Sequence, residues 1–143
     1  MPEKLPGDPA AGARLYQAKG CNACHIVRGQ GSGYGPELTA IGSRRSAAYL
    51  RESLVRPAAA APDNFLLVEA VDTAGRTHRG IRRNEDSFTI QIQDDARRFH
   101  SFRKSGLKDL RRLTGQSPMP ASQLSPRELD DMVAYLASLR GAE

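Results

Sequence analysis

The chain has 143 residues, of which 39% are hydrophobic and 26% are charged, so it has enough apolar side chains for the core of one modest domain. It contains no run of about 18 apolar residues, which argues against a membrane-spanning helix. The net charge is +5 and is unevenly placed, because residues 76–112 hold eleven basic and five acidic side chains and so carry +6 by themselves.

A first helix is predicted directly after Asp8-Pro9, since aspartate is a frequent N-cap and proline suits the first helical position. The helix should run for about 12 residues towards Gly20 and place Gly12 and Tyr16 on one face. The segment that follows this helix carries the most specific motif of the sequence.

This motif is Cys21-Asn22-Ala23-Cys24-His25, which has the C-x-x-C-H pattern of covalent haem attachment. Two cysteines three positions apart fall on the same side of one helical turn, where each sulfur can form a thioether with a haem vinyl group. His25 then follows at the proximal face of the iron. The sequence therefore predicts one haem c, covalently bound through Cys21 and Cys24, with His25 as an iron ligand.

Three other readings of the cysteine pair are weaker. A thioredoxin-like redox pair needs an adjacent strand–helix unit, whereas a helix is predicted here. A zinc site needs further ligands, but there is no second cysteine pair, and His78 and His100 lack the short spacing of a zinc finger. A plain disulfide is the third alternative. None of the three requires a histidine in the fifth position.

Several features together resemble class I cytochrome c: Gly12 with Tyr16, the C-x-x-C-H motif, Gly-Pro-x-Leu at residues 35–38, a late methionine and an amphipathic last helix. The resemblance implies that the carbonyl oxygen of Pro36 accepts a hydrogen bond from His25. Such a bond would orient the imidazole and strengthen its donation to iron. The alternative is that Pro36 is only a turn residue.

The middle of the chain departs from the usual pattern of that family. Ser46 should cap a helix that ends near Val55, and residues 58–62 are predicted as an extended connector between prolines. Apolar alternation and turn residues then predict strands at residues 65–71, 77–83, 87–93 and 97–102. Residues 104–114 fit a short helix or a return strand equally well. The inserted sheet resembles the hairpin-expanded haem domains attached to exported dehydrogenase-like proteins.

The predicted fold class is therefore mainly α, with N- and C-terminal helices that cross beside a haem core and an inserted antiparallel sheet of three to four strands. We expect a single cytochrome c domain over residues 1–143, with the sheet inserted at residues 63–104. The last helix should begin at Ser125-Pro126 with a capping box and end near Leu139. The family resemblance implies that the apolar face of this last helix packs against Gly12 and Tyr16 of the first helix.

Four residues are candidates for the sixth iron ligand: Met119, Met132, His78 and His100. Met119 is favoured, because the flanking prolines stiffen an extended loop and the segment looks like the Met-Pro loop of the family. Met132 falls on the apolar face of the last helix and is expected in the core. The two histidines are expected as exposed strand residues. The predicted metal ligands are thus His25 and Met119.

An iron bound on both sides has no open position for substrate, so the predicted function is transfer of single electrons between redox partners. The protein is expected to be an electron carrier and not an enzyme, or the electron-transfer domain of a larger oxidoreductase. The alternative is a haem enzyme or gas sensor whose sixth ligand is displaced. A third possibility is a basic binding module in which the haem is only structural.

The positive charge of residues 76–112 predicts docking to an acidic redox protein or to an anionic membrane surface, with a merely solvated surface as the alternative. No nucleic-acid recognition motif is present, so no nucleic-acid partner is expected. Haem attachment of this kind takes place outside the bacterial cytoplasm, yet residues 1–5 lack the apolar core of a signal peptide. We expect a periplasmic or otherwise exported protein, here a mature or excised segment with an added Met1, as a monomer or part of a larger chain.

Overall fold

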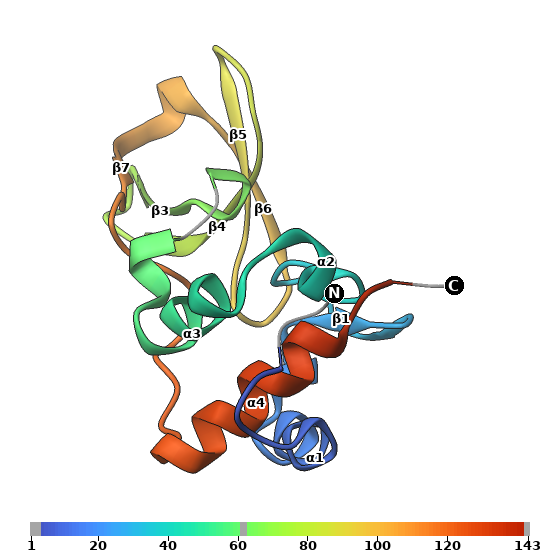
Figure 1. The fold of residues 1–143 in the computed structure, drawn as a ribbon. Helices are drawn as coiled ribbons and strands as arrows, with labels where there is room; N and C mark the ends of the chain where they lie inside the picture. The colour runs from blue at the N-terminus through green and yellow to red at the C-terminus, as the bar shows by residue number, and fades with distance from the viewer. Residues whose placement is uncertain (1–3, 61–62, 142–143) are drawn as a thin grey trace. The chain divides into compact units, whose positions relative to one another are not determined.

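The computed structural model describes residues 4–60 and 63–141, which fall into two compact units (Figure 1). We call Met1–Arg56 with Ala121–Glu143 the helical unit and Pro57–Pro120 the sheet unit. Met1, on which the expectation of a processed start depends, and residues 61–62 of the predicted connector lie outside the described residues. None of the helices in the described part of the chain has the length and apolar character of a membrane span.

The helical unit contains α1 (Pro9–Ala18), α2 (Ile41–Arg44), α3 (Ala47–Val55) and α4 (Pro126–Ser138), with a 3-10 turn η1 (Cys21–Ala23) and a short hairpin of β1 (Ile26–Val27) and β2 (Gln30–Gly31). The predicted starts of three helices are confirmed. The side chains of Asp8 and Ser46 accept backbone hydrogen bonds at the starts of α1 and α3. Ser125 and Glu128 form the predicted capping box of α4.

Helix α1 lies against α4, with its glycine at the closest approach (Figure 1). A Cβ atom added at Gly12 would lie 2.6 Å from the Cβ of Tyr135 and would also meet the carbonyl oxygen of Asp131. One turn later the ring centroids of Tyr16 and Tyr135 are 5.6 Å apart. The glycine therefore lets the two backbones approach, and the tyrosines fill the space beside it. Met132 is buried in the core of this unit, as predicted.

The chain leaves the helical unit after α3 and returns to it before α4. At this point the backbone N–H and the Oγ of Ser122 both donate to the carbonyl oxygen of Leu54, each over 2.9 Å. These bonds join the two separate chain segments that make up the helical unit.

The sheet unit contains β3 (Leu67–Asp72), β4 (Thr77–Glu85), β5 (Thr89–Gln93), β6 (Phe99–Arg103) and β7 (Leu107–Arg112), with 3-10 turns η2 (Pro57–Ala60), η3 (Asp63–Phe65) and η4 (Lys104–Gly106). The strands form one antiparallel sheet in the order β6-β5-β4-β3-β7, so the last strand pairs with the first. Its core is formed by Val68, Ala70, Ile90 and Ile92. The tract predicted as an extended connector forms η2 over its described part.

The prediction of a mainly α fold is wrong, because the described residues form a five-stranded sheet as well as four α-helices, and the fold is mixed α and β. The sheet also has one strand more than the three to four predicted. The additional strand is β7, which lies in residues 104–114, the segment for which the sequence did not decide between a helix and a strand. Leu107 and Leu110 are three positions apart, which suits a helix, yet both pack against the sheet core. A β-bulge near Val71 and Asp72 shifts the register of the pairing between β3 and β7. Because of this shift, two leucines three positions apart in a strand can both face the core.

Candidate functional site

The C-x-x-C-H motif forms one tight turn directly after α1. The backbone N–H groups of Cys24 and His25 both donate to the carbonyl oxygen of Cys21, over 3.2 and 3.0 Å. Both cysteines are free thiols and are partly buried, so the structure does not show the disulfide alternative. Burial raises the pKa of the Cys21 thiol. Two sulfurs and an imidazole are thus supplied from a single turn, as the spacing predicts.

The imidazole of His25 is fixed by the residue that the family resemblance singled out. Its Nδ1 lies 2.8 Å from the carbonyl oxygen of Pro36. A carbonyl can only accept, so Nδ1 carries the hydrogen and the lone pair of Nε2 remains for a metal. Burial lowers the pKa of His25, while the bond to Pro36 raises it and opposes burial. The ring is therefore held in the neutral form and in the tautomer that a metal ligand needs.

Gly35 is a site residue whose role the sequence did not reveal. Its N–H donates to the carbonyl oxygen of Cys24 over 2.5 Å. A Cβ atom added at Gly35 would lie 2.7 Å from Cε1 and 2.9 Å from Nδ1 of His25, so any other residue would displace the ring. The position of a glycine immediately before Pro36 is the only sequence signal for this contact.

Tyr16 supports the motif from α1. Its hydroxyl donates to the carbonyl oxygen of His25 over 3.5 Å, and its side chain is only 2% exposed. Burial, reinforced by the neighbouring cysteine thiols and Tyr135, raises the pKa of Tyr16 to about 12. The hydroxyl therefore remains a donor throughout the physiological pH range.

These residues fit a covalently attached haem. The chemistry of the donor set is that of C-x-x-C-H sites, with two unlinked thiols and one neutral imidazole whose second nitrogen is hydrogen-bonded. In contrast, the described residues contain no cluster of three or more His, Cys, Asp or Glu side chains that could bind a metal ion. The zinc interpretation therefore gains no support.

Met119 lies in the sheet unit, whereas His25 lies in the helical unit. The backbone N–H of Met119 donates to Oγ of Ser117 over 3.1 Å, and the flanking prolines keep the segment out of helix or strand. The side chain is partly buried. The role of Met119 as the sixth ligand stays a prediction.

His78 and His100, the alternative ligands, are held in local pairs with aspartates. Nε2 of His78 lies 3.0 Å from Oδ2 of Asp72, and Nε2 of His100 lies 2.8 Å from Oδ2 of Asp94. The centroids of the two imidazole rings are 5.5 Å apart, and the ring of Phe102 lies beside both. Both histidines are partly buried, not exposed as predicted.

The histidine–aspartate pairs predict an acid-sensitive sheet unit. The hydrogen bonds from His78 and His100 are the main cause that lowers the pKa values of Asp72 and Asp94 below 3.8. A carboxylate with a lowered folded pKa stabilises the protein above its unfolded pKa, and this contribution is lost as the pH falls through the folded pKa. We therefore expect the stability of the sheet unit to fall below about pH 4.

Urea unfolding followed by circular dichroism at neutral pH and at about pH 3 measures this loss. The double variant Asp72→Asn with Asp94→Asn should lose less stability on acidification than the wild type. Asp109→Asn, which removes an exposed carboxylate of β7, is the matched control and should lose as much as the wild type. Equal acid losses in the double variant and the wild type would contradict the prediction.

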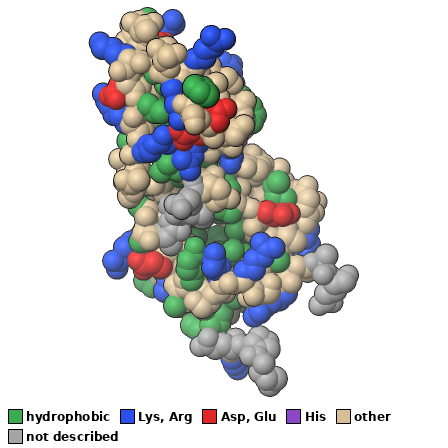
Figure 2. Space-filling model, turned by 90° about the horizontal axis from the view of Figure 1, so that it is seen from above, with side chains coloured by type: hydrophobic (Ala, Val, Ile, Leu, Met, Phe, Trp, Pro, Cys, Tyr) green, Lys and Arg blue, Asp and Glu red, His purple; other side chains and the backbone are tan. Residues whose placement is uncertain are grey.

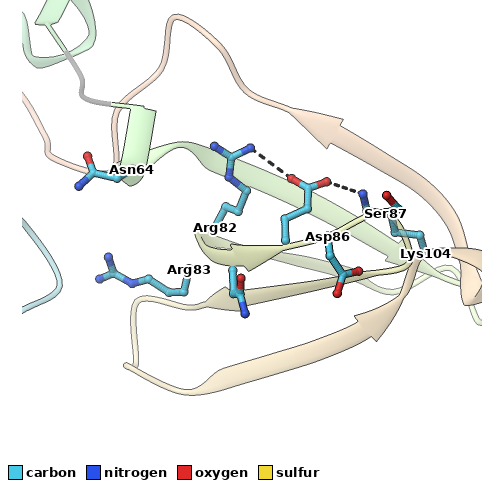
Figure 3. A pocket seen from close by; sticks show the side chains of 8 residues that line it. Asn64, Arg82, Arg83, Asp86, Ser87 and Lys104 are labelled. Atoms are coloured by element: carbon cyan, nitrogen blue, oxygen red, sulfur yellow. Dashed lines mark hydrogen bonds and ion pairs between the residues drawn. The ribbon is translucent and has the colours of Figure 1, made fainter.

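An open hollow of about 690 Å³ in the sheet unit has polar and charged walls (Figure 3). The carboxylate of Glu85 at this hollow is bound by Arg82 over 3.2 Å, by Lys104 over 2.7 Å and by Arg112 over 2.5 Å. Figure 3 draws the contacts of Arg82 and Lys104 as dashed lines. The three cations, Arg112 foremost, hold the pKa of Glu85 well below its ordinary range. The cluster ties β4 to β7 and to η4.

Charged side chains of both signs are also interspersed elsewhere on the surface. Figure 2 shows Lys and Arg side chains spread over the face that it draws, with Asp and Glu side chains set among them. The excess of positive charge at residues 76–112 belongs to the sheet unit.

Comparison with known proteins gives one family match. The family model described as Cytochrome c matches residues 9–85, which is more than half of the chain and includes the C-x-x-C-H motif. None of the curated proteins matches. Among solved structures, SoxXA from P. pantotrophus is 20% identical with a TM-score of 0.49, over 94% of this chain and 83% of that chain.

A second solved structure, of the Dcp1:Dcp2 mRNA decapping complex and its activation by Edc3 and Scd6, contains a chain 24% identical with a TM-score of 0.34. That match covers 48% of this chain and 58% of the other, so this chain spans less than two thirds of its length. Both TM-scores lie below 0.5, so neither likeness supports a conclusion about the fold or function of this chain.

Proposed function

Since the chain belongs to the cytochrome c family, we propose that it is an exported single-electron carrier whose haem iron is bound by His25 and Met119. Members of this family bind haem c covalently and carry electrons, and Cys21 and Cys24 beside His25 are the cysteines available for attachment. The observation that carries the proposal is the 2.8 Å contact between Nδ1 of His25 and the carbonyl oxygen of Pro36.

The residues of the helical unit hold and orient the cofactor. Cys21 and Cys24 would tether the macrocycle, and His25 would bind the iron through Nε2. Pro36 fixes the imidazole plane and keeps the hydrogen on Nδ1, which makes Nε2 a stronger donor. When bound, the haem supplies an iron that alternates between the ferrous and ferric states. Gly35 leaves room for the ring, and Tyr16 anchors the backbone of His25.

Met119 is proposed as the second axial ligand. Its thioether is a soft neutral donor, which favours ferrous iron and raises the reduction potential. The support comes from its place between Pro118 and Pro120, whose rings restrict the backbone of the loop, and from the burial of Met132 at 1% exposure. A methionine in that buried core is unavailable without repacking α4.

The proposed partner is a redox protein with an acidic docking face. The sheet unit contains residues 76–112, which carry a net charge of +6, and a positive field of this kind accelerates encounters with an acidic partner. Export is proposed from the chemistry of covalent haem attachment, which takes place outside the bacterial cytoplasm. Two further points stay predictions. The first is that residues 1–143 form one domain with an insertion at residues 63–104, and the second is that the protein is a monomer or part of a larger chain.

The variant Met119→Ala tests the proposal. We expect the haem to stay attached, because neither cysteine nor His25 is changed, while the ferric spectrum becomes high-spin and carbon monoxide binds the ferrous form at once. The reduction potential should fall by a sizeable part of the roughly 0.8 V range that axial ligands span. Absorption spectra, a pyridine haemochrome assay and a redox titration measure these three results.

Met132→Leu is the matched control, because it removes a thioether from the core at nearly constant volume. It should keep the wild-type spectrum and potential. An unchanged spectrum in Met119→Ala would mean that a residue other than Met119 is the sixth ligand of the iron. A wild-type protein that binds cyanide or carbon monoxide immediately would instead favour the haem enzyme or gas sensor.

A further inference from the structure

Strand β6 lies at one edge of the five-stranded sheet. Among the described strands it pairs only with β5, so one side of its backbone lacks a strand partner. The opposite edge is β7, which carries the bulge. Bulges are a common way to stop a sheet edge from pairing. Strand β6 is regular over its whole pairing with β5.

The register shows which backbone groups of β6 point away from the sheet. The N–H of Lys104 donates to the carbonyl oxygen of Phe88 over 2.8 Å, and the N–H of Asp94 donates to that of Arg98 over 2.9 Å. These bonds mark two hydrogen-bonded pairs at the ends of the β5–β6 ladder. Such pairs alternate with non-hydrogen-bonded pairs in an antiparallel ladder. The N–H and C=O groups of Phe99, Ser101 and Arg103 therefore point outward.

The side chains of the same three residues are also exposed and share one face of the sheet. Phe99 is 57% exposed, which is unusual for so large an apolar side chain, and Ser101 and Arg103 are exposed as well. The alternate residues, His100 and Phe102, are partly buried on the core face. The edge thus offers a row of backbone donors and acceptors beside one apolar and one cationic side chain.

The strand and its two flanks carry only basic charged side chains, of which Lys104 is paired with Glu85 over 2.7 Å. Residues 97–104 read Arg-Arg-Phe-His-Ser-Phe-Arg-Lys and contain four basic residues and no acidic residue. A strand added here would lie along these cations, so acidic side chains on it would be favoured and basic ones disfavoured. The same charges disfavour pairing of β6 with the β6 strand of a second copy of this chain.

A second copy is in fact a poor occupant. Antiparallel pairing of two β6 strands about Ser101 would place Arg98 of one copy opposite Lys104 of the other, at both ends of the pairing. Like charges directly opposite each other destabilise a strand pair. The charge pattern therefore selects a partner with carboxylates.

We infer that β6 is a docking edge for an extended acidic segment of a partner protein, which adds to the sheet as a sixth strand beside Phe99, Ser101 and Arg103. The backbone groups of these residues supply the pairing, and the flanking cations supply the preference for acidic sequence. An apolar residue of the segment would cover Phe99. This inference depends on the sheet unit and not on the role of the haem, so it can fail or succeed independently of electron transfer.

The test uses the haem-loaded protein and a ten-residue peptide of alternating glutamate and valine. We expect binding at low salt, measured by calorimetry, with new protection of the Phe99, Ser101 and Arg103 amides against hydrogen exchange. A peptide in which proline replaces the valines keeps the charge but cannot pair, and it should bind at least tenfold more weakly.

Ser101→Pro removes one outward N–H without touching the bonds to β5, and proline is tolerated on edge strands. It should weaken peptide binding about tenfold, the effect of one lost hydrogen bond. Ser101→Thr keeps the N–H and should bind as the wild type does. The amide protection in the wild-type protein gives a second readout if the proline variant does not fold.

Three results would overturn the inference. The first is equal binding of the two peptides, or binding that Ser101→Pro leaves unchanged, which would indicate unspecific attraction of a polyanion. The second is the absence of binding at low salt. The third is sedimentation of the protein as a dimer that Ser101→Pro dissociates, which would make a second copy the occupant of this edge.

Discussion

Replacement of Gly12 by valine should lower the free energy of unfolding of the helical unit by about 3 kcal/mol or more. A Cβ atom at this position would lie 2.6 Å from that of Tyr135 and would overlap the backbone carbonyl of Asp131. Backbone atoms of α4 cannot rotate away, so the two helices must separate. The small gain in helix propensity over glycine, below about 1 kcal/mol, cannot offset this clash.

Gly106→Val is the matched control for this prediction. Gly106 lies in η4 with nothing within 4 Å of an added Cβ atom, and its φ angle is not positive. The control variant should unfold within about 0.5 kcal/mol of the wild type. Denaturant unfolding of the haem-loaded proteins gives both values. A Gly12→Val protein as stable as the wild type would mean that α1 and α4 do not approach as closely as the structure shows.

The second large effect is expected for Glu85→Gln, which should destabilise the sheet unit by about 2 kcal/mol. The Glu85 side chain is 13% exposed, and the variant leaves Arg82, Lys104 and Arg112 facing one another without their shared carboxylate. Removal of a buried ion-pair partner costs about 3–5 kcal/mol, and the value here is smaller because the cations are 28–41% exposed.

Glu52→Gln provides the comparison for Glu85→Gln. Glu52 is 43% exposed and pairs with Arg56 over 3.5 Å on the surface of α3. A surface pair of this kind contributes at most about 1 kcal/mol, so the control should change little. Unfolding at low and high salt adds a second check, since the defect of Glu85→Gln should shrink when salt screens the three cations. A stable Glu85→Gln protein would show that the cluster is not important for the sheet.

The features that the sequence predicts correctly are local ones. Asp8, Ser46 and Ser125 cap helices through bonds to residues two or three positions away, so short motifs are sufficient to identify them. The turn at Cys21–His25 is local in the same way. The contact between His25 and Pro36 spans eleven positions and was found only through the family resemblance.

The features that the sequence did not predict depend on contacts between distant segments. β7 forms because residues 107–112 pair with β3, and its three-residue leucine spacing becomes compatible with a strand only through a bulge. The cations around Glu85 come from β4, η4 and β7, and no local pattern links them. For the same reason the close approach of Gly35 to His25 leaves no sign in the sequence beyond the glycine itself.

The tie between Ser122 and Leu54 has a consequence for how the chain acquires its structure. Most strands of the sheet unit pair with their neighbours in sequence, so its contacts are short-range and can form early. The helical unit must instead bring α1 and α4 together across more than a hundred residues, which is entropically costly in an open chain. If residues 57–120 fold first, a compact unit replaces the open chain between the two segments of the helical unit, so nucleation of the sheet would accelerate assembly of the helices.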